Sequence, residues 1–518
     1  MKTTLLILST FFFCFESKAQ FGGDVTIQPS SDNQTAVEIA SAFNGWLFSA
    51  VSFENEGTNT GGIVLRKSID NGLSWSTVYS LTSTGVRYDN VDVIVTGSTE
   101  IDLYVSLAYI SRFVATSTYD ISIKRIAAAT NSDLGLSFYL NKGTNKVYDI
   151  ELASDYLLPA SVSSPYSVAM LYSCYSSSYD SIVSVVSVNG GVSYGIKNTV
   201  ATTGSYFRNI SLDYGRSSSG SNGRYFAAWE RLSSTSARTG GIYTSRNSST
   251  VDGPWITPVN LDSVSSTMIN LCRNPRIAVQ HSTIDSDSGG VSAIVLVDRD
   301  YTGDGSDYDL LGFYNKRSHY SNFWYRFDVV NSNENDTYGD AVFDPVSNQF
   351  CISYLDSTNQ QLKLSRKDFN MPSPSSWTME LNTINDNPAL TKEPKTRLVF
   401  RPLENEVAIA WIDQVGTNGV AKIDAESFSG VGLAEQKGTQ VLEIYPNPAS
   451  EKVTISLENG LIDRVSFVDI SGKLCLSVAN TQKGNEMDLS VNELKTGVYF
   501  VTVLTTDNQQ STIKFIKK

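Results

Sequence analysis

Short apolar segments alternate with polar, glycine-rich stretches along most of the chain. Tyr, Phe, Ser, Thr, Val and Ile are abundant, whereas long runs of Ala, Leu, Glu and Lys are absent. Residues that favour strands therefore outnumber those that favour helices. The pattern predicts an all-β protein.

One apolar strand, usually closed by an acidic residue, recurs seven times at intervals of about 55 to 65 residues, a spacing typical of repeat architectures. Its copies end at Glu54, Ile110, Cys174, Glu230, Asp298, Asp356 and Asp413. Each copy has one strand before it and one strand after it, and a fourth strand follows in most repeats. The unit is therefore a four-stranded meander. Only six fourth strands can be found, and residues 24–28 near the start of the chain supply the seventh. This predicts a seven-bladed β-propeller, with six or eight blades as the alternatives.

A turn in the first repeat has a distinctive sequence. Residues 68–75 place Ser68, Asp70, Gly72 and Trp75 in the pattern S-x-D-x-G-x-x-W, and residues 187–194 repeat the spacing with Asn for Asp and Tyr for Trp. The motif resembles the Asp-box, or BNR repeat, of sialidase-like propellers. Its role is structural, because the Asp caps its own turn, the Gly adopts a left-handed conformation and the Trp packs between blades.

The same resemblance implies a set of catalytic groups: an arginine triad, a tyrosine paired with a glutamate, and an aspartate. Residues 45–68 resemble the first blade of that family, but they hold no arginine near Glu54 and Glu56. No catalytic residue is therefore assigned from the sequence.

The first residues of the chain and the net charge of the protein indicate its compartment and exclude some partners. Residues 1–19 read as a signal peptide, with Lys2 before an apolar run and a small-residue exit at Ala19. No later segment is apolar for long enough to form a membrane helix. The net charge is −13 and no basic stripe occurs, so nucleic acid is not an expected partner. The four cysteines after residue 19 show no paired spacing and are expected to be small buried residues.

The propeller should span residues 20–428, followed by a linker at 429–440 and a second domain at 441–518. That domain contains Pro446 and Pro448 near its start, a turn at 469–473, a strand at 494–500 and a basic end at 514–518. Over its whole length it is similar to the type A C-terminal sorting domain of type IX secretion substrates. The resemblance implies a small β-sandwich, recognition by the secretion translocon, and a secreted or cell-surface protein. An ordinary sandwich that serves as a binding module is the alternative.

The ends of the second strands and the starts of the first strands should converge on the mouth of the propeller, where ligands bind. The candidate ligand-binding residues are Arg87, Arg208, Arg273, Arg397, Tyr148, Tyr338, Glu54, Glu230, Asp356 and Asp413. The arginines suit the carboxylate or sulfate of an acidic sugar. The alternative is that they pair with acids of neighbouring blades and only fasten the ring.

One loop, at 298–309, alternates acids with glycines. Its candidate calcium ligands are Asp298, Asp300, Asp304, Asp307 and Asp309, and the alternative is a solvated acidic loop. No other cofactor is indicated, because His281 and His319 are the only histidines and lie far apart in sequence.

The leading hypothesis is an exported propeller that binds glycan or a surface protein at its mouth without catalysis. The first rival is a sialidase-like hydrolase or a polysaccharide lyase that acts on acidic sugars. The second rival is a structural component of the cell surface.

Overall fold

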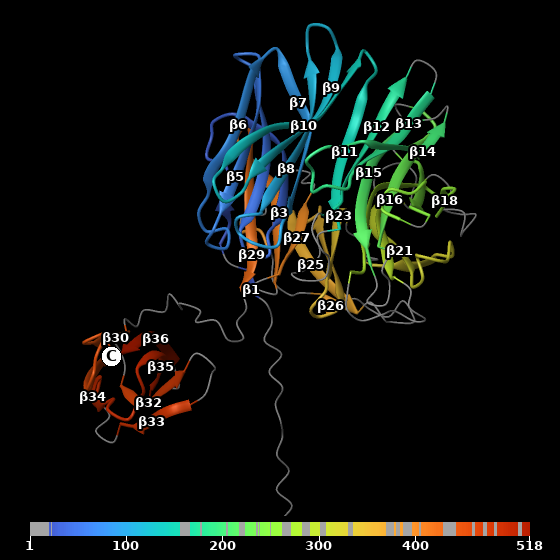
Figure 1. Ribbon diagram of the computed structural model, residues 1–518. Helices are drawn as coiled ribbons and strands as arrows, with labels where there is room; N and C mark the ends of the chain where they lie inside the picture. Colours follow the sequence, from blue (N-terminus) through green and yellow to red (C-terminus); the bar gives the residue numbers. More distant parts are fainter. Residues whose placement is uncertain are drawn as a thin grey trace, which may run out of the picture. The chain divides into compact units, whose positions relative to one another are not determined.

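The computed structural model contains strands, turns and loops, and no helix among the residues that it describes (Figure 1). These residues are 20–21, 23–155, 166–176, 179–203, 206–216, 223–234, 237, 239–248, 250–261, 271–281, 291–300, 307–329, 335–368, 378–379, 384–386, 396–402, 406–427, 442–457, 461–469, 474–480, 484–505 and 510–518. The all-β prediction is confirmed. In this part of the chain, no helix has the length and hydropathy needed to cross a membrane.

The chain divides into two compact units, Ala19–Glu426 and Ser427–Lys518. The described residues of the first unit form seven antiparallel sheets, numbered here 1 to 7 in chain order. Sheets 1 to 3 consist of β3 (Asn33–Ser41), β4 (Leu47–Asn55), β5 (Thr60–Ser68), β6 (Ser76–Thr84); β7 (Val86–Thr96), β8 (Tyr104–Phe113), β9 (Thr118–Ala127), β10 (Ser132–Gly143); and β11 (Val147–Ser154), β12 (Val168–Ser176), β13 (Tyr179–Ser187), β14 (Ile196–Thr203).

Sheets 4 to 6 repeat the same order of four consecutive strands. They consist of β15 (Tyr206–Gly215), β16 (Arg224–Leu232), β17 (Gly241–Arg246), β18 (Val259–Asn260); β19 (Cys272–Val279), β20 (Ala293–Asp300), β21 (Tyr308–Asn315), β22 (Tyr325–Asp328); and β23 (Asp336–Asp344), β24 (Gln349–Asp356), β25 (Gln361–Asp368), β26 (Thr378–Met379).

Sheet 7 joins the two ends of the propeller unit. Its strands β27 (Arg397–Arg401), β28 (Glu406–Val415) and β29 (Asn418–Ser427) come from the end of the unit, and β1 (Gln20–Phe21) and β2 (Val25–Thr26) pair with β29 from its beginning. The N–H of Ile27 continues the pairing with a 2.9 Å bond to the carbonyl of Ala421. Residues 24–28 therefore complete the last sheet, as the sequence predicted. A strand from the start of the chain covers an edge that would otherwise be unpaired.

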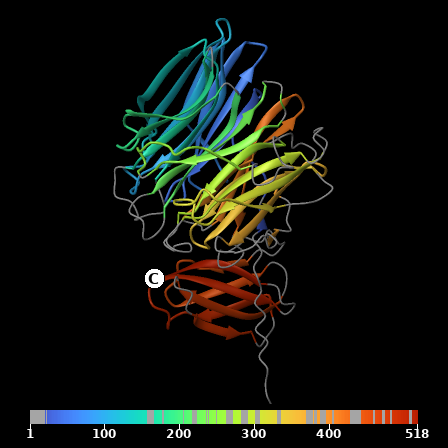
Figure 2. The same ribbon diagram turned by 90° about the vertical axis from the view of Figure 1, so that its right-hand side faces the viewer.

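The sheets are held together face to face by apolar side chains. Every pair of successive sheets shares one buried cluster, and the ring closes because sheet 7 shares a cluster with sheet 1 that contains Ile27, Val37 and Ile423. Burying one such side chain contributes roughly 1.5–3 kcal/mol. The first strands β3, β7, β11, β15, β19, β23 and β27 contact one another in that order and surround the centre (Figures 1 and 2).

Carboxylates reinforce this packing near the centre. Asp92 accepts the N–H of Leu152 on the next sheet, and Asp340 does the same for Leu398. The other bonds of this kind run from Ile210 to Asp149, from Val279 to Asp213 and from Tyr338 to Asp298. Four of these bonds link neighbouring first strands, and the bond to Asp298 links β23 to the second strand β20 of the preceding sheet. The acids at these positions therefore help to fasten the ring.

The turn at 68–75 has the geometry that its sequence suggests. Asp70 Oδ1 accepts the N–H of Ser74 at 2.9 Å and the hydroxyl of Ser68 at 2.8 Å, and Trp75 Nε1 donates to the carbonyl of Gly72 at 2.9 Å. Gly72 has a φ of 87°, which suits a residue without Cβ. Trp75 packs on the cluster between sheets 7 and 1. Asp70 thus stabilises a turn.

The second unit contains two sheets, drawn in orange to red in Figure 2. One consists of β30 (Leu442–Tyr445), β31 (Lys452–Leu457) and β34 (Glu486–Ser490); the other consists of β33 (Leu474–Ala479), β32 (Ile462–Asp469), β35 (Gly497–Thr505) and β36 (Gln510–Lys517). Both sheets contribute to one apolar core around Phe467 and Phe515. Three cysteines of the chain are buried as predicted, but Cys475 on β33 is exposed, so that part of the cysteine prediction is wrong.

Candidate functional site

A central channel runs between the seven first strands and encloses a cavity of about 270 Å³. Every first strand contributes a polar side chain to the lining of this channel, from within the strand in six cases and from the first residue of the strand in β27. These side chains are Glu38, Asp92, Glu151, Ser211, Arg276, Asp340 and Arg397. The channel therefore carries a ring of four acids and two arginines at one level.

Ion pairs cross this channel. Arg276 Nη1 lies 2.7 Å from Glu151 Oε1, and Arg397 Nη2 lies 3.8 Å from the same oxygen. Arg397 also pairs with Glu38 on the adjacent β3. Burial, together with the charges of Glu151 and Glu38, raises the pKa of Asp92 well above its usual range. Two arginines thus face a surplus of acids, and the protonated state of an acid is favoured there.

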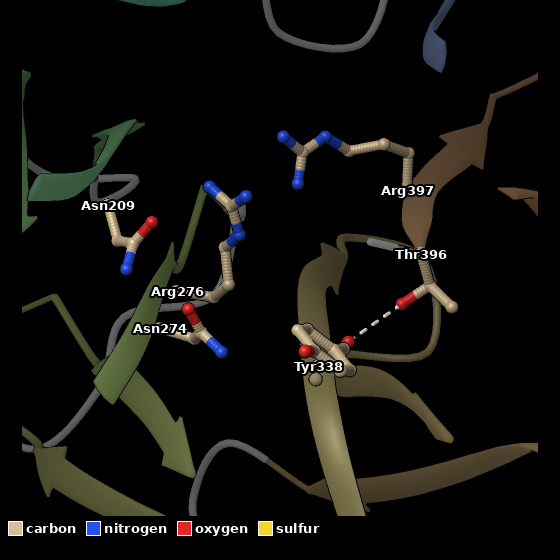
Figure 3. A pocket seen from close by; sticks show the side chains of 7 residues that line it. Asn209, Asn274, Arg276, Tyr338, Thr396 and Arg397 are labelled. Carbon is tan, nitrogen blue, oxygen red and sulfur yellow. Dashed lines mark hydrogen bonds between the residues drawn. The ribbon is translucent and has the colours of Figure 1, made fainter. Parts of the chain in front are cut away.

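A small pocket opens where the two arginines meet other polar groups (Figure 3). Its lining residues are Asn209, Asn274, Arg276, Tyr338, Gly339, Thr396 and Arg397, and its interior of about 10 Å³ holds about one water molecule. We call this space the mouth pocket. Figure 3 shows the guanidinium groups of Arg276 and Arg397 directed toward the same gap.

Backbone irregularities position the rim of the mouth pocket. Asn209, Asn274 and Tyr338 have φ values of 48°, 51° and 56°, and each lies at a break in the pairing of a first strand with its neighbour. Bulges of this kind re-aim side chains and occur often beside active sites. The hydroxyl of Thr396 donates a 3.1 Å bond to the carbonyl of Tyr338, which holds the rim in place.

The predicted mouth arginines do not gather around one void. Arg87 pairs with Glu54 of the preceding sheet at 3.2 Å, whereas Arg273 pairs with Asp298 of its own sheet at 3.3 Å. Arg208 lies over the ring of Tyr148, 5.6 Å from its centroid. The structure therefore favours the ring-fastening interpretation for Arg87 and an intrasheet pairing for Arg273. Arg397 alone of the four lies deeper, level with Arg276.

Glu230 is the most unusual of the predicted acids. Its side chain accepts a 2.8 Å bond from Asn209, a residue of the mouth pocket, while its Oε1 is buried without a hydrogen-bond partner. Burial, only partly offset by Asn209, Arg273 and Arg208, raises the pKa of Glu230 to about 7. A carboxyl group of this kind can hold or release a proton near neutral pH.

The remaining predicted ligand-binding residues do not share one site. Asp356 accepts bonds from Asn359 and Lys363 within its own hairpin, and Asp413 accepts the indole N–H of Trp411. The ring of Tyr338 lies 5.5 Å from the guanidinium carbon of Arg273. Tyr338 and Arg397 are thus the predicted residues that line the mouth pocket. Asp356 and Asp413 instead accept hydrogen bonds from residues close to them in sequence.

The acidic loop does not present its five acids as one set. Asp304 lies outside the described residues. Asp298 is engaged with Arg273 and Asn274, and Asp309 pairs across the sheet with Arg299, on the face opposite to Asp298 and Asp300. The part of the chain that the structure describes contains no group of three or more side chains able to hold a metal. Asp298 and Asp309 therefore do not meet on one face of the sheet. The calcium site as a whole stays a prediction, because residues 301–306 lie outside the described residues.

Sequence reasoning missed Glu38, Asp92, Glu151 and Arg276. A signal was present, because each interrupts an apolar first strand with a charge, as in the segments 36–40, 90–95 and 276–279. A charged residue is rarely fully buried unless it is paired. This interruption, found in several successive repeats, marks the channel better than the ends of the strands do.

Solved structures with a similar architecture include several enzymes. An α-L-arabinanase of Penicillium chrysogenum complexed with arabinobiose shows 13% identity and a TM-score of 0.40, with 78% of this chain and 98% of that chain covered. A polysaccharide lyase that acts on ulvan, bound to -[GlcA(1-4)Rha3S]-, shows 8% identity and a TM-score of 0.41, with 79% and 94% covered. At these sequence identities and TM-scores the likeness is one of architecture, and it assigns no substrate to this chain. No curated protein matches the sequence.

The second unit has a clear relative. Residues 443–518 match the family described as the secretion system C-terminal sorting domain. The match includes nearly all residues of the second unit that the structure describes from β30 to the end of the chain. The chain thus ends in a sorting domain of type IX secretion, and it is exported to the cell surface or secreted.

Proposed function

We propose that the propeller acts outside the cell on an acidic polysaccharide, whose anionic group binds in the mouth pocket. The observation that carries the proposal is the composition of this pocket. Arg276 and Arg397 bring guanidinium groups, Asn209 and Asn274 bring amides, and Tyr338 brings a phenol. No carboxylate occurs among the described residues that line it. The pocket is thus lined by a set of hydrogen-bond donors, and its two guanidinium groups also pair with Glu151 and Glu38 of the channel.

Such a set suits a carboxylate or sulfate group on a sugar. A guanidinium group has five N–H donors, and its planar fork matches the oxygens of an oxyanion. Among the described groups, Arg276 uses only Nη1, for Glu151 and the carbonyl of Ile210. Its Nη2 is therefore left for a ligand, and the amides of Asn209 and Asn274 suit sugar hydroxyls. Export through type IX secretion is consistent with a polymer outside the cell as the ligand.

The same composition favours cleavage by elimination over hydrolysis by two carboxylates. Hydrolysis needs an acid and a base that flank the scissile bond, usually as a pair of Asp or Glu residues. Elimination instead needs donors that neutralise the uronate carboxylate and a group that takes the proton from C5. The C4=C5 double bond then forms as the C4–O bond breaks, and the leaving oxygen takes up a proton. Tyr338 is the group at the pocket that suits the proton exchange. Its left-handed backbone, with a φ of 56°, is the kind of strain that clusters at active sites.

The experiment presents residues 20–518 of the chain with uronate-rich, sulfated and neutral polysaccharides. Binding is measured by calorimetry, and cleavage by the ultraviolet absorbance of unsaturated uronate ends and by new reducing ends. Arg276→Lys should weaken binding of the acidic polymer about tenfold, because lysine keeps the charge for Glu151 and loses the fork. Tyr338→Phe should lower cleavage at least about a hundredfold and change affinity little.

The matched control is Arg326→Lys, which alters an arginine on the outer strand β22 that pairs with Asp328. It should behave as the wild type. Reducing ends without ultraviolet absorbance would assign hydrolysis and contradict the role of Tyr338 in elimination. Binding without cleavage by any polymer would reduce the function to glycan recognition. Equal affinity for neutral and acidic polymers, or none for either, would overturn the proposal.

A further inference from the structure

Two arginines meet between sheets 4 and 5 without an acidic partner. Arg224 begins β16 and Arg246 ends β17, so both lie at the same edge of sheet 4. Arg224 Nη1 and Arg246 Nε donate to one acceptor, the carbonyl oxygen of His319 in the turn between β21 and β22 of sheet 5, at 2.8 and 3.0 Å. Neither arginine forms an ion pair with any described acid. The two positive groups are therefore held close together by one neutral oxygen.

This arrangement is electrostatically unfavourable as it stands. Arg246 is only 8% exposed, and like charges repel more strongly where water is excluded. Burial and then the charge of Arg224 lower the pKa of Arg246 to about 10. Burial and the same two arginines lower the pKa of His319 to about 4, so its ring is neutral at neutral pH. The chain has a net charge of −13, yet among the described residues no acid pairs with either arginine.

The surroundings of Arg246 provide a place for an anion. Arg246, Thr244, Ser321, Asn322 and Trp324 line a pocket whose interior of about 10 Å³ accommodates one oxygen-sized atom. Arg246 Nη1 donates a 3.0 Å bond to Asn322, which orients the guanidinium group along the pocket wall. Hydroxyl, amide and guanidinium groups at one opening are the donors that an oxyanion requires.

An exposed aromatic ring lies beside this pocket. Tyr320 is 69% exposed, and its ring meets the ring of His319 edge to face at 6.0 Å. His319 itself is buried and stacks on Phe226 of sheet 4, and its Nε2 has no hydrogen-bond partner. The buried histidine thus holds Tyr320 in place at the surface, next to the carbonyl that both arginines contact.

We propose that Arg224, Arg246 and Asn322 form a second anion site, remote from the mouth pocket, that binds a sulfate or carboxylate group of an acidic saccharide, with Tyr320 against the sugar ring. One oxygen of the anion enters the pocket and the others meet Arg224 at its opening. The anion site stands without the proposed function, but the assignment of its anion to a polysaccharide rests on it. A second site would keep a long polymer attached while another stretch occupies the mouth pocket.

The first test uses inorganic sulfate as the probe. Thermal unfolding of residues 20–518 is followed in sodium sulfate and in sodium chloride of equal ionic strength. The wild type should show a sulfate-dependent rise in Tm that saturates, beyond the unsaturable rise that sulfate gives to any protein. Arg224→Gln, at a half-buried position, should lose the part of the saturable rise that belongs to this site, leaving at most the part due to the mouth pocket, and Arg326→Gln should keep the whole rise. An unchanged saturable rise in Arg224→Gln would overturn the anion site.

The second test separates the sugar from the ion. In an Arg276→Lys background, which weakens the mouth pocket, Tyr320→Ala should reduce the affinity for an acidic oligosaccharide about fivefold. The same variant should leave the sulfate response unchanged. A sulfate response with no effect of Tyr320→Ala on the oligosaccharide would overturn the saccharide assignment. Because Arg224→Gln leaves the mouth pocket intact, loss of polysaccharide cleavage by this variant at saturating substrate would also contradict a purely auxiliary site.

Discussion

Arg276 on β19 forms a 2.7 Å ion pair with Glu151 on β11, two sheets away across the central channel. Sheet 4 lies between them in the ring, so this pair joins sheets that share no apolar cluster. Both side chains are largely buried, with 11% and 14% exposed. The pair therefore stabilises the channel as a whole and at the same time holds Arg276 at the mouth pocket.

Removal of the ion pair between Glu151 and Arg276 should lower the free energy of unfolding. Glu151→Gln leaves Arg276 buried without its carboxylate and takes one of two acids from Arg397. Loss of one partner of a buried ion pair costs about 3–5 kcal/mol. Denaturant unfolding of the purified protein measures the change. Asp133→Asn is the control, because Asp133 is 43% exposed and its pair with Lys124 should contribute less than about 1 kcal/mol. Equal losses in the two variants would show that the channel pair has no special weight.

Glu230 should make the propeller less stable as the pH rises. Burial raises its pKa from the ordinary 4.5 to about 7, so the protonated acid is favoured in the folded state. The resulting stabilisation is complete below pH 4.5 and is lost between about pH 4.5 and 7. Glu230→Gln should match the wild type near pH 4 and exceed its unfolding free energy by up to roughly 3 kcal/mol at pH 8. Unfolding curves at both pH values test this. A difference that is independent of pH would contradict it.

The turn at Asp70 should affect stability and leave activity unchanged. Asp70→Ala removes the acceptor for the N–H and the hydroxyl of Ser74 and for the hydroxyl of Ser68, three bonds that together contribute about 2–3 kcal/mol. The unfolding free energy should fall by this amount, while polysaccharide binding stays the same. Asn189→Ala, in the second copy of the motif, should cause a similar loss, because Asn189 accepts the N–H of Ser193. Asp252→Ala, at an exposed position, is the control. A loss of binding in Asp70→Ala at unchanged stability would point to a role at the site.

Asn447 should control export. Its side chain donates a 2.7 Å bond to the carbonyl of Lys514 and accepts the N–H of Ile516 at 2.9 Å, which fixes the last strand of the sorting domain. Asn447→Ala should destabilise this domain by about 1–2 kcal/mol and lower the fraction of protein that reaches the surface or the medium. Immunoblots of cell and medium fractions measure this fraction. Ser490→Ala, on β34, is the control, and equal export of both variants would contradict the prediction.

Several parts of the fold could be predicted because they depend on local chemistry that repeats. The apolar strands recur at a constant interval, so the sheets could be placed in the sequence. The closing role of residues 24–28 followed because a ring leaves no room for an unpaired edge. The bonds within residues 68–75 need only neighbouring residues. The sorting domain was recognised because its turns and its basic end follow one another in a fixed order.

The site was predicted less well, since its geometry depends on register. Bulges beside Asn209, Asn274 and Tyr338 each shift the pairing of a first strand by one residue, whereas the described part of β27 pairs without a shift. Arg87, Arg208 and Arg273 precede the irregularities in their strands, and Arg397 has none beside it. One residue of shift moves a side chain to the other face of a strand. Arg397 therefore joins Arg276 in the channel, whereas Arg87 and Arg273 bind acids near the strand ends.

The sequence by itself determined that this chain is an exported all-β protein with repeated four-stranded units and a sorting domain, because strand periodicity, turns and targeting signals are local properties. Only the tertiary structure decided which charges meet. Glu151 contacts Arg276 and Arg397 across the channel, and Arg224 and Arg246 share the carbonyl of His319, although each contact joins residues that are far apart in sequence. Ion pairing depends on distance in space and on the exclusion of water, and both arise only when the ring closes.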